Sequence, residues 1–105
     1  MNKPRIYVDL NEMVTSDIVL LSKEDTEVDS EGTVITFYEG MPINIYSDDL
    51  SDNGEVDNII AEGVATQLDL SNYPNWQHVK WCCKIDLNSM RHESEEENES
   101  GKRKL

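Results

Sequence analysis

Residues 41–70 read MPINIYSDDLSDNGEVDNIIAEGVATQLDL. Two runs of apolar residues interspersed with polar ones, 41–47 and 58–70, enclose an acidic segment with Asn53-Gly54 near its centre. Apolar and polar residues that alternate with a period of two predict strands. An Asn-Gly pair between two such runs is a strong signal for a β-hairpin. The stretch therefore predicts that these two strands pair in an antiparallel hairpin.

The length of the hairpin loop has two interpretations. A two-residue turn at Asn53-Gly54 would set Ile45 opposite Glu62, which brings a charge to a buried face. A bulge beside Glu62 would correct this register. An open loop over residues 47–57, with Asn53-Gly54 only at its tip, lets the carboxylates spread into water. We favour the open loop.

Further short apolar runs predict strands on either side of this hairpin. Residues 17–22 are too apolar for strict alternation, which is typical of a strand buried on both faces. Residues 11–17 hold one helical turn at most, and the polar residues 23–33 predict a connector with a turn at 30–32. Gly63 predicts a bulge or a sharp bend within its strand. The strands predicted outside the hairpin cover residues 5–10, 17–22, 33–39 and 79–86.

The strand count predicts the fold class. Six or seven short strands in a chain of 105 residues are typical of an all-β barrel or sandwich. We expect a small single-domain β-barrel over residues 1–90, SH3-like in topology, with a small β-sandwich as the alternative. Residues 91–105 contain almost no apolar side chains, so they predict a disordered acidic tail.

Charge restricts the classes of partner. The formal net charge is −13, and such a surface repels nucleic acids and anionic membranes while attracting basic proteins. No apolar run has the length of a signal peptide or a membrane-spanning helix, and two cysteines do not make a disulfide framework. We expect a cytoplasmic protein, and nothing in the sequence calls for a cofactor.

The order of Asp, Asn and Gly in the acidic segment suggests a calcium loop. The best EF-hand register starts at Asp49 and brings Asn53, Gly54 and Asp57 to positions that the motif uses. The final position should carry a bidentate carboxylate, but Ile60 occupies it. The EF-hand is therefore rejected. A looser site, built on Asp49, Asn53 and Asp57, stays open as an alternative.

Two adjacent cysteines lie in the strand predicted over 79–86. Neighbouring residues of a strand point to opposite faces, so we expect no disulfide between Cys82 and Cys83. Lys80 and Lys84 flank Cys82 on its face, and their charges would lower the pKa of its thiol and make it the more reactive of the two. An ordinary, partly covered cysteine is the alternative, and we favour it. We assign the opposite face to the core; it carries Val79, Trp81, Cys83 and Ile85.

No motif for catalysis is present. The two histidines do not lie at zinc or nucleophile spacing from the cysteines, and no phosphate-binding or nucleophile-elbow motif occurs. We therefore expect a small, acidic, non-enzymatic interaction module.

We expect this module to bind a basic partner protein as an inhibitor, an immunity protein or a regulator would. A calcium-binding β-module that uses residues 48–57, and a purely structural role, are the alternatives. Exposed strand edges leave a weak dimer open. Aromatic anchors beside carboxylates predict the binding residues: Tyr46, Asp48, Asp49, Asp52, Glu55, Asp57, Tyr73 and Trp76.

Overall fold

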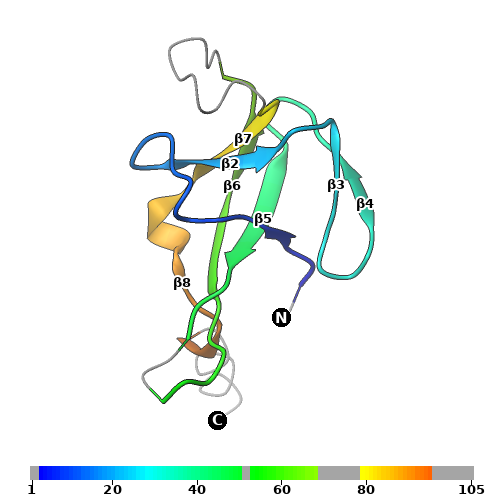
Figure 1. The fold of residues 1–105 in the computed structure, drawn as a ribbon. Helices are drawn as coiled ribbons and strands as arrows, with labels where there is room; N and C mark the ends of the chain where they lie inside the picture. Colours follow the sequence, from blue (N-terminus) through cyan, green and yellow to red (C-terminus); the bar gives the residue numbers. More distant parts are fainter. Residues whose placement is uncertain (1–2, 51–52, 69–78, 96–105) are drawn as a thin grey trace.

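The computed structural model describes residues 3–50, 53–68 and 79–95. Its secondary structure is mostly β, which confirms the all-β class that the sequence predicts. Figure 1 shows the strands curling around one side of the molecule. The elements are β1 (Ile6–Tyr7), β2 (Ile18–Ser22), β3 (Thr26–Val28), β4 (Val34–Thr36), β5 (Pro42–Ser47), β6 (Ile59–Thr66), β7 (Trp81–Ile85), the 3-10 turn η2 (Leu87–Ser89) and β8 (Arg91–His92).

The main sheet is a curled half-barrel with the strand order β1-β5-β6-β7-β2. β1 runs parallel to β5, and the other neighbours are antiparallel. β8 pairs with Ile59 and Ile60 at the start of β6, and β7 pairs with residues 63–66 further along the same strand. β3 and β4 form a separate two-stranded ribbon, which projects beside the half-barrel in Figure 1.

β5 and β6 form the predicted hairpin, in a register one residue away from that of a two-residue turn. Ile45 lies opposite Ala61, and Glu62 lies opposite Asn44. Because a shift of one residue exchanges the two faces of a strand, this register keeps the charge of Glu62 off the core face. It requires no bulge in β6.

The bulge predicted at Gly63 is therefore wrong, and the residue has a different role. Gly63 pairs regularly with Ile43 on one side and with Ile85 on the other. A Cβ atom at this position would collide with the carbonyl oxygen of Lys84 and lie 2.8 Å from Cys83 Sγ. Glycine is needed here for the close approach of β7. The register shift of the sheet lies in β2, between Leu20 and Ser22.

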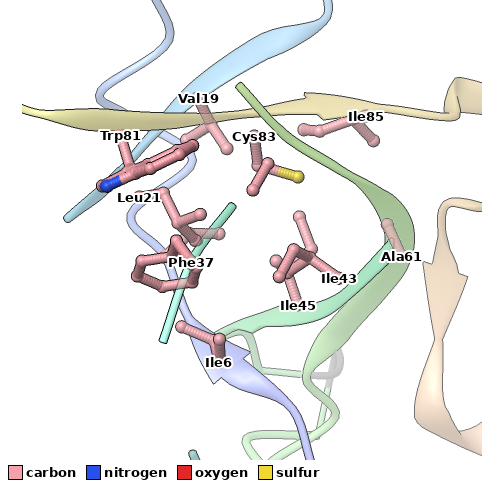
Figure 2. Close-up of a cluster of buried hydrophobic side chains, with 12 residues drawn as sticks. Ile6, Val19, Leu21, Phe37, Ile43, Ile45, Ala61, Trp81, Cys83 and Ile85 are labelled. Carbon is pink, nitrogen blue, oxygen red and sulfur yellow. The ribbon is translucent and has the colours of Figure 1, made fainter. Parts of the chain in front are cut away.

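The core fills the concave side of the half-barrel. Figure 2 shows Phe37 beside Trp81 and Ile43 beside Ile45, with Cys83 above them. The rings of Phe37 and Trp81 lie 5.9 Å apart between centroids. The buried members of this cluster are Ile6, Val8, Val19, Leu21, Phe37, Ile43, Ile45, Ala61, Ala65, Trp81, Cys83 and Ile85.

A second, smaller hydrophobic cluster lies on the convex side of β2 and β7. It corrects the predicted position of Val79 on the core face of β7. Leu20 and Cys82 are its buried members, and Val79 packs against them rather than beside Trp81. Val79 precedes β7, so the alternation of the strand does not extend to it. β2 is buried on both faces, as predicted.

One of the two predicted connectors, residues 23–33, differs from the structure, and the other, residues 11–17, agrees with it. Residues 23–33 contain β3, whose pairing with β4 ends in a turn that Gly32 makes with a φ of +85°. Both faces of β3 are largely exposed, so no apolar alternation marks this strand in the sequence. Residues 11–17 make turns and a single bridge between Met13 and Val19, without a helical turn.

The folded part of the chain extends past residue 90, where the sequence analysis placed the start of a disordered tail. Ile59 and Ile60 of β6 pair with His92 and Arg91 of β8, and such ladder bonds require an ordered partner. The rest of the predicted tail, 96–105, lies outside the described residues.

Candidate functional site

The end of the β5–β6 hairpin contains most of the predicted site. A bridge between Leu50 and Val56 continues the ladder beyond β5 and β6, and the backbone N–H of Asp57 donates to the carbonyl of Asp49 at 3.0 Å. The open loop predicted over 47–57 is therefore narrower than expected. Of the described residues, 53–55 lie beyond the bridge, and Gly54 makes the turn with a φ of +83°.

The first residues of the predicted tail clasp this hairpin. His92 Nε2 lies 2.8 Å from Asp49 Oδ2. Ser94 donates to both carboxylate oxygens of Asp57, from its hydroxyl at 2.7 Å and from its backbone N–H at 3.1 Å. The backbone N–H of Glu93 donates to the carbonyl of Asn58. We call residues 92–94 and these contacts the clasp.

The clasp changes the proton affinity of its members. The hydrogen bond with Asp49 raises the pKa of His92, and the nearby charges of Asp57 and Glu95 add to that shift. The hydrogen bond with His92 lowers the pKa of Asp49, and those from Ser94 lower the pKa of Asp57. A protonated imidazole between carboxylates thus favours the clasped form.

A second set of charges holds β8 in place. Arg5 is buried, and its Nη1 donates to the carbonyl of Ala61 at 3.0 Å and to Glu62 Oε2 at 2.9 Å. Arg91 Nη1 donates to the other oxygen of the same carboxylate at 3.1 Å. Burial alone raises the pKa of Glu62, but the hydrogen bond from Arg5 and the charge of Arg91 outweigh it and leave the pKa lowered.

The clasp leaves an apolar pair exposed at the hairpin end. Leu50 and Val56 face each other across the bridge and are 63% and 73% exposed. Asp48 and Glu55, both predicted site residues, are also exposed beside them. The surface formed by Asp48, Leu50, Glu55 and Val56 is called the hairpin tip below.

Leu50, Val56 and Tyr7 are not among the binding residues that the sequence predicts. Tyr46 was predicted as a binding residue, and its ring meets that of Tyr7 edge-on at a centroid distance of 5.5 Å. The pKa of Tyr7 is raised by desolvation and then by the negative charges of Asp48 and Asp9. The alternation of residues 6–10 could have placed Tyr7 on the outer face, since Ile6 and Val8 point inward.

The remaining predicted residues divide into two groups. Asp49 and Asp57 belong to the site region, but their carboxylates accept hydrogen bonds from the clasp. Asp52, Tyr73 and Trp76 lie outside the described residues.

The residues of the calcium alternative are also engaged within the chain. The side-chain oxygen of Asn53 accepts from the backbone N–H of Glu55 at 3.2 Å, while Asp49 and Asp57 bind His92 and Ser94. In the described ranges, no group of three or more His, Cys, Asp or Glu side chains is arranged to hold a metal ion.

The structure favours an ordinary cysteine at position 82 over a reactive one. Both cysteines are buried free thiols. Burial raises the pKa of Cys82, and burial together with the neighbouring thiol raises that of Cys83 to about 12. Lys80 and Lys84 are exposed and do not offset the loss of water around the sulfur.

Comparisons with known proteins return no match, whether to protein-family models, to curated proteins or to solved structures. Among the residues that the structure describes, no helix is long and apolar enough to cross a membrane. The function is therefore inferred from the chain's own residues.

Proposed function

We propose that the protein is a small, non-enzymatic interaction module that binds a basic partner protein through the hairpin tip. The observation that carries this proposal is the exposure of Leu50 and Val56 as a directly opposed pair between carboxylates. Apolar residues surrounded by charged ones are typical of the centre and rim of a protein interface.

Charge supports the choice of a basic partner. The chain carries a formal net charge of −13, and a field of that sign accelerates encounter with positively charged surfaces and disfavours negatively charged ones. Asp48 and Glu55 would face Lys or Arg side chains around an apolar pocket of the partner that receives Leu50 and Val56. The inhibitor, immunity and regulatory roles expected from the sequence all fit this mode.

The clasp supports the same proposal through rigidity. A two-stranded hairpin end that projects from a sheet is marginally stable by itself. Contacts of His92 and Ser94 hold its two strands from the side, so less conformational entropy is lost when the tip binds. An SH3-like topology for the half-barrel belongs to this proposal as well and is supported only by the short strands and the curl of the sheet.

Affinity capture tests the proposal. The full tagged chain, its Leu50→Ser/Val56→Ser variant and a Leu87→Ser control are incubated with lysate of the source cells at physiological salt. Leu87 is an exposed apolar residue of η2, away from the tip. The wild type and the control should retain the same basic protein, which the double variant loses.

Capture of the same proteins by all three chains would contradict the hairpin tip as the binding surface. Retention of no basic protein, at low as well as physiological salt, would contradict a basic partner altogether. Circular dichroism of the three chains shows that each is folded before the capture is interpreted.

A further inference from the structure

A groove of about 480 Å³ lies between β1, the end of β2, and β3, and no residue of the hairpin tip lines it. Val8, Leu20 and Leu21 line it but are almost fully buried, at 2%, 8% and 6% exposed, and Tyr7 and Val28 stand at its two walls. Both wall residues are substantially exposed. The groove is thus an open channel bounded by two strands.

The β1 wall turns unpaired backbone groups into the groove. Ile6 pairs with Ile45, and the backbone N–H of Val8 donates to the carbonyl of Tyr46 at 2.9 Å. Alternate residues of a strand direct their N–H and C=O groups to opposite sides. Those of Tyr7 therefore point away from β5, and no described strand pairs with them.

The β3 wall also directs backbone groups toward the groove, from the opposite side. Asp25 and Asp29 form the hydrogen bonds that continue the ladder with β4, so the backbone groups of Val28 point to the other edge. That edge faces β1, because the N–H of Ser30 donates to the carbonyl of Arg5 at 2.8 Å. This contact joins the two walls at one end, and beyond it they enclose the groove.

Charge in the groove is strongly one-sided. Within the described lining, four carboxylates stand against a single ammonium group, that of Lys23. An extended chain that adds as a strand to a free strand edge forms backbone hydrogen bonds with that edge. Its alternate side chains contact the protein surface on either face of the added strand. The four carboxylates belong to Asp9, Glu12, Glu24 and Glu27.

We propose that the groove binds an extended Lys- or Arg-containing segment of a partner protein, added as a strand between β1 and β3. Its backbone would bond with Tyr7 and Val28, its apolar side chains would pack against the exposed side chains of the same two residues, and its basic side chains would meet the carboxylates. This site is separate from the hairpin tip, and its proposal does not depend on the proposed function.

Fluorescence anisotropy tests this with a short labelled peptide in which Arg and Val alternate, bound to the full chain at physiological salt. A second peptide carries N-methyl groups on alternate backbone amides, and a third replaces Arg by Glu. The first should bind, the third should not, and methylation should weaken binding by about tenfold or more. In amide spectra of the chain, the largest changes should fall on Tyr7 and Val28.

Matched variants separate the groove from general attraction to an acidic protein. Glu27→Gln should weaken peptide binding several-fold, whereas Glu31→Gln, which removes the same charge outside the lining in the β3–β4 turn, should leave it unchanged. Leu50→Ser/Val56→Ser should also leave it unchanged, which distinguishes this site from the hairpin tip. Equal affinity for the methylated peptide, or an equal effect of Glu27→Gln and Glu31→Gln, would overturn the proposal.

Discussion

His92 Nε2 lies 2.8 Å from Asp49 Oδ2, although 43 positions separate the two residues in the chain. This contact fastens β8 and the residues after it to the acidic hairpin. Two carboxylates of the hairpin, those of Asp49 and Asp57, are thus bound by His92 and Ser94 of the same chain. Leu50 and Val56 remain as the exposed apolar surface of the hairpin.

The clasp should depend on pH through both partners. The pKa of His92 is raised, so its contribution is complete below the pKa of His in the unfolded chain and is lost as the pH rises through the folded-state value. The pKa of Asp49 is lowered, so its contribution is lost as the pH falls through that value. The protection factors of the amides in residues 91–95, which compare exchange with that of an unstructured chain at the same pH, should be largest between these limits.

A titration of the His92 ring by NMR gives the matched control. Asp49→Asn should lower the pKa of His92 toward that of a free histidine, because the acceptor that favours the imidazolium is weakened. Asp48→Asn removes the same charge from the neighbouring residue and should change it much less. Equal shifts in the two variants would show that general charge, and not the contact, raises the pKa.

Arg5 should contribute strongly to stability. Its side chain is 1% exposed and holds Glu62 together with buried carbonyls. Arg5→Met should lower the free energy of unfolding by about 2–3 kcal/mol, less than for a fully buried pair because Glu62 is 34% exposed. Urea denaturation measures the change.

The exposed ion pair of Lys80 with Asp25 is the control for Arg5. Lys80→Met should cost less than about 1 kcal/mol, because water and salt screen a pair at the surface. If Arg5→Met and Lys80→Met lower the free energy of unfolding equally, burial does not decide how strongly these ion pairs stabilise the protein.

Gly63→Ala should destabilise the sheet although alanine is the smallest possible addition. Its Cβ would collide with the Lys84 carbonyl and crowd Cys83, so β6 and β7 would have to separate. We expect a loss of about 3 kcal/mol in the free energy of unfolding. Val64→Ala, on the exposed face of the same strand, should cost about 1 kcal/mol or less. A neutral Gly63→Ala would contradict the close approach of the two strands.

The two thiols should be slow to react in the folded protein. Cys82 and Cys83 are buried, and their raised pKa values keep them protonated at neutral pH. A chromogenic disulfide reagent should label neither in native buffer within minutes and both in denaturant. Fast labelling of Cys82 in native buffer would instead support a thiol activated by Lys80 and Lys84.

Local pattern was sufficient to predict the strands that border the core. Ile43 and Ile45 alternate with polar residues, and the apolar run of β2 is buried on both faces as expected. β3 could not be found this way, since its side chains are largely exposed on both faces. A strand without a buried face leaves no periodic signal.

The site depends on relationships that no local pattern contains. The register of β5 and β6 differs by one residue from that of a two-residue turn, and this difference sets Leu50 opposite Val56. The clasp joins segments that lie on opposite sides of β7 in the chain. The sequence shows where the carboxylates lie along the chain, but only the fold shows that Asp49 and Asp57 form hydrogen bonds with other residues of the chain.

Photo-crosslinking tests the proposed binding surface most directly. A benzophenone side chain is introduced at Val56 of the full chain and, separately, at Leu87, and both chains are irradiated in lysate of the source cells. We expect a discrete crosslink to a basic protein from Val56 and none from Leu87. The absence of a discrete product from Val56, or the same product from both positions, would contradict binding through the hairpin tip.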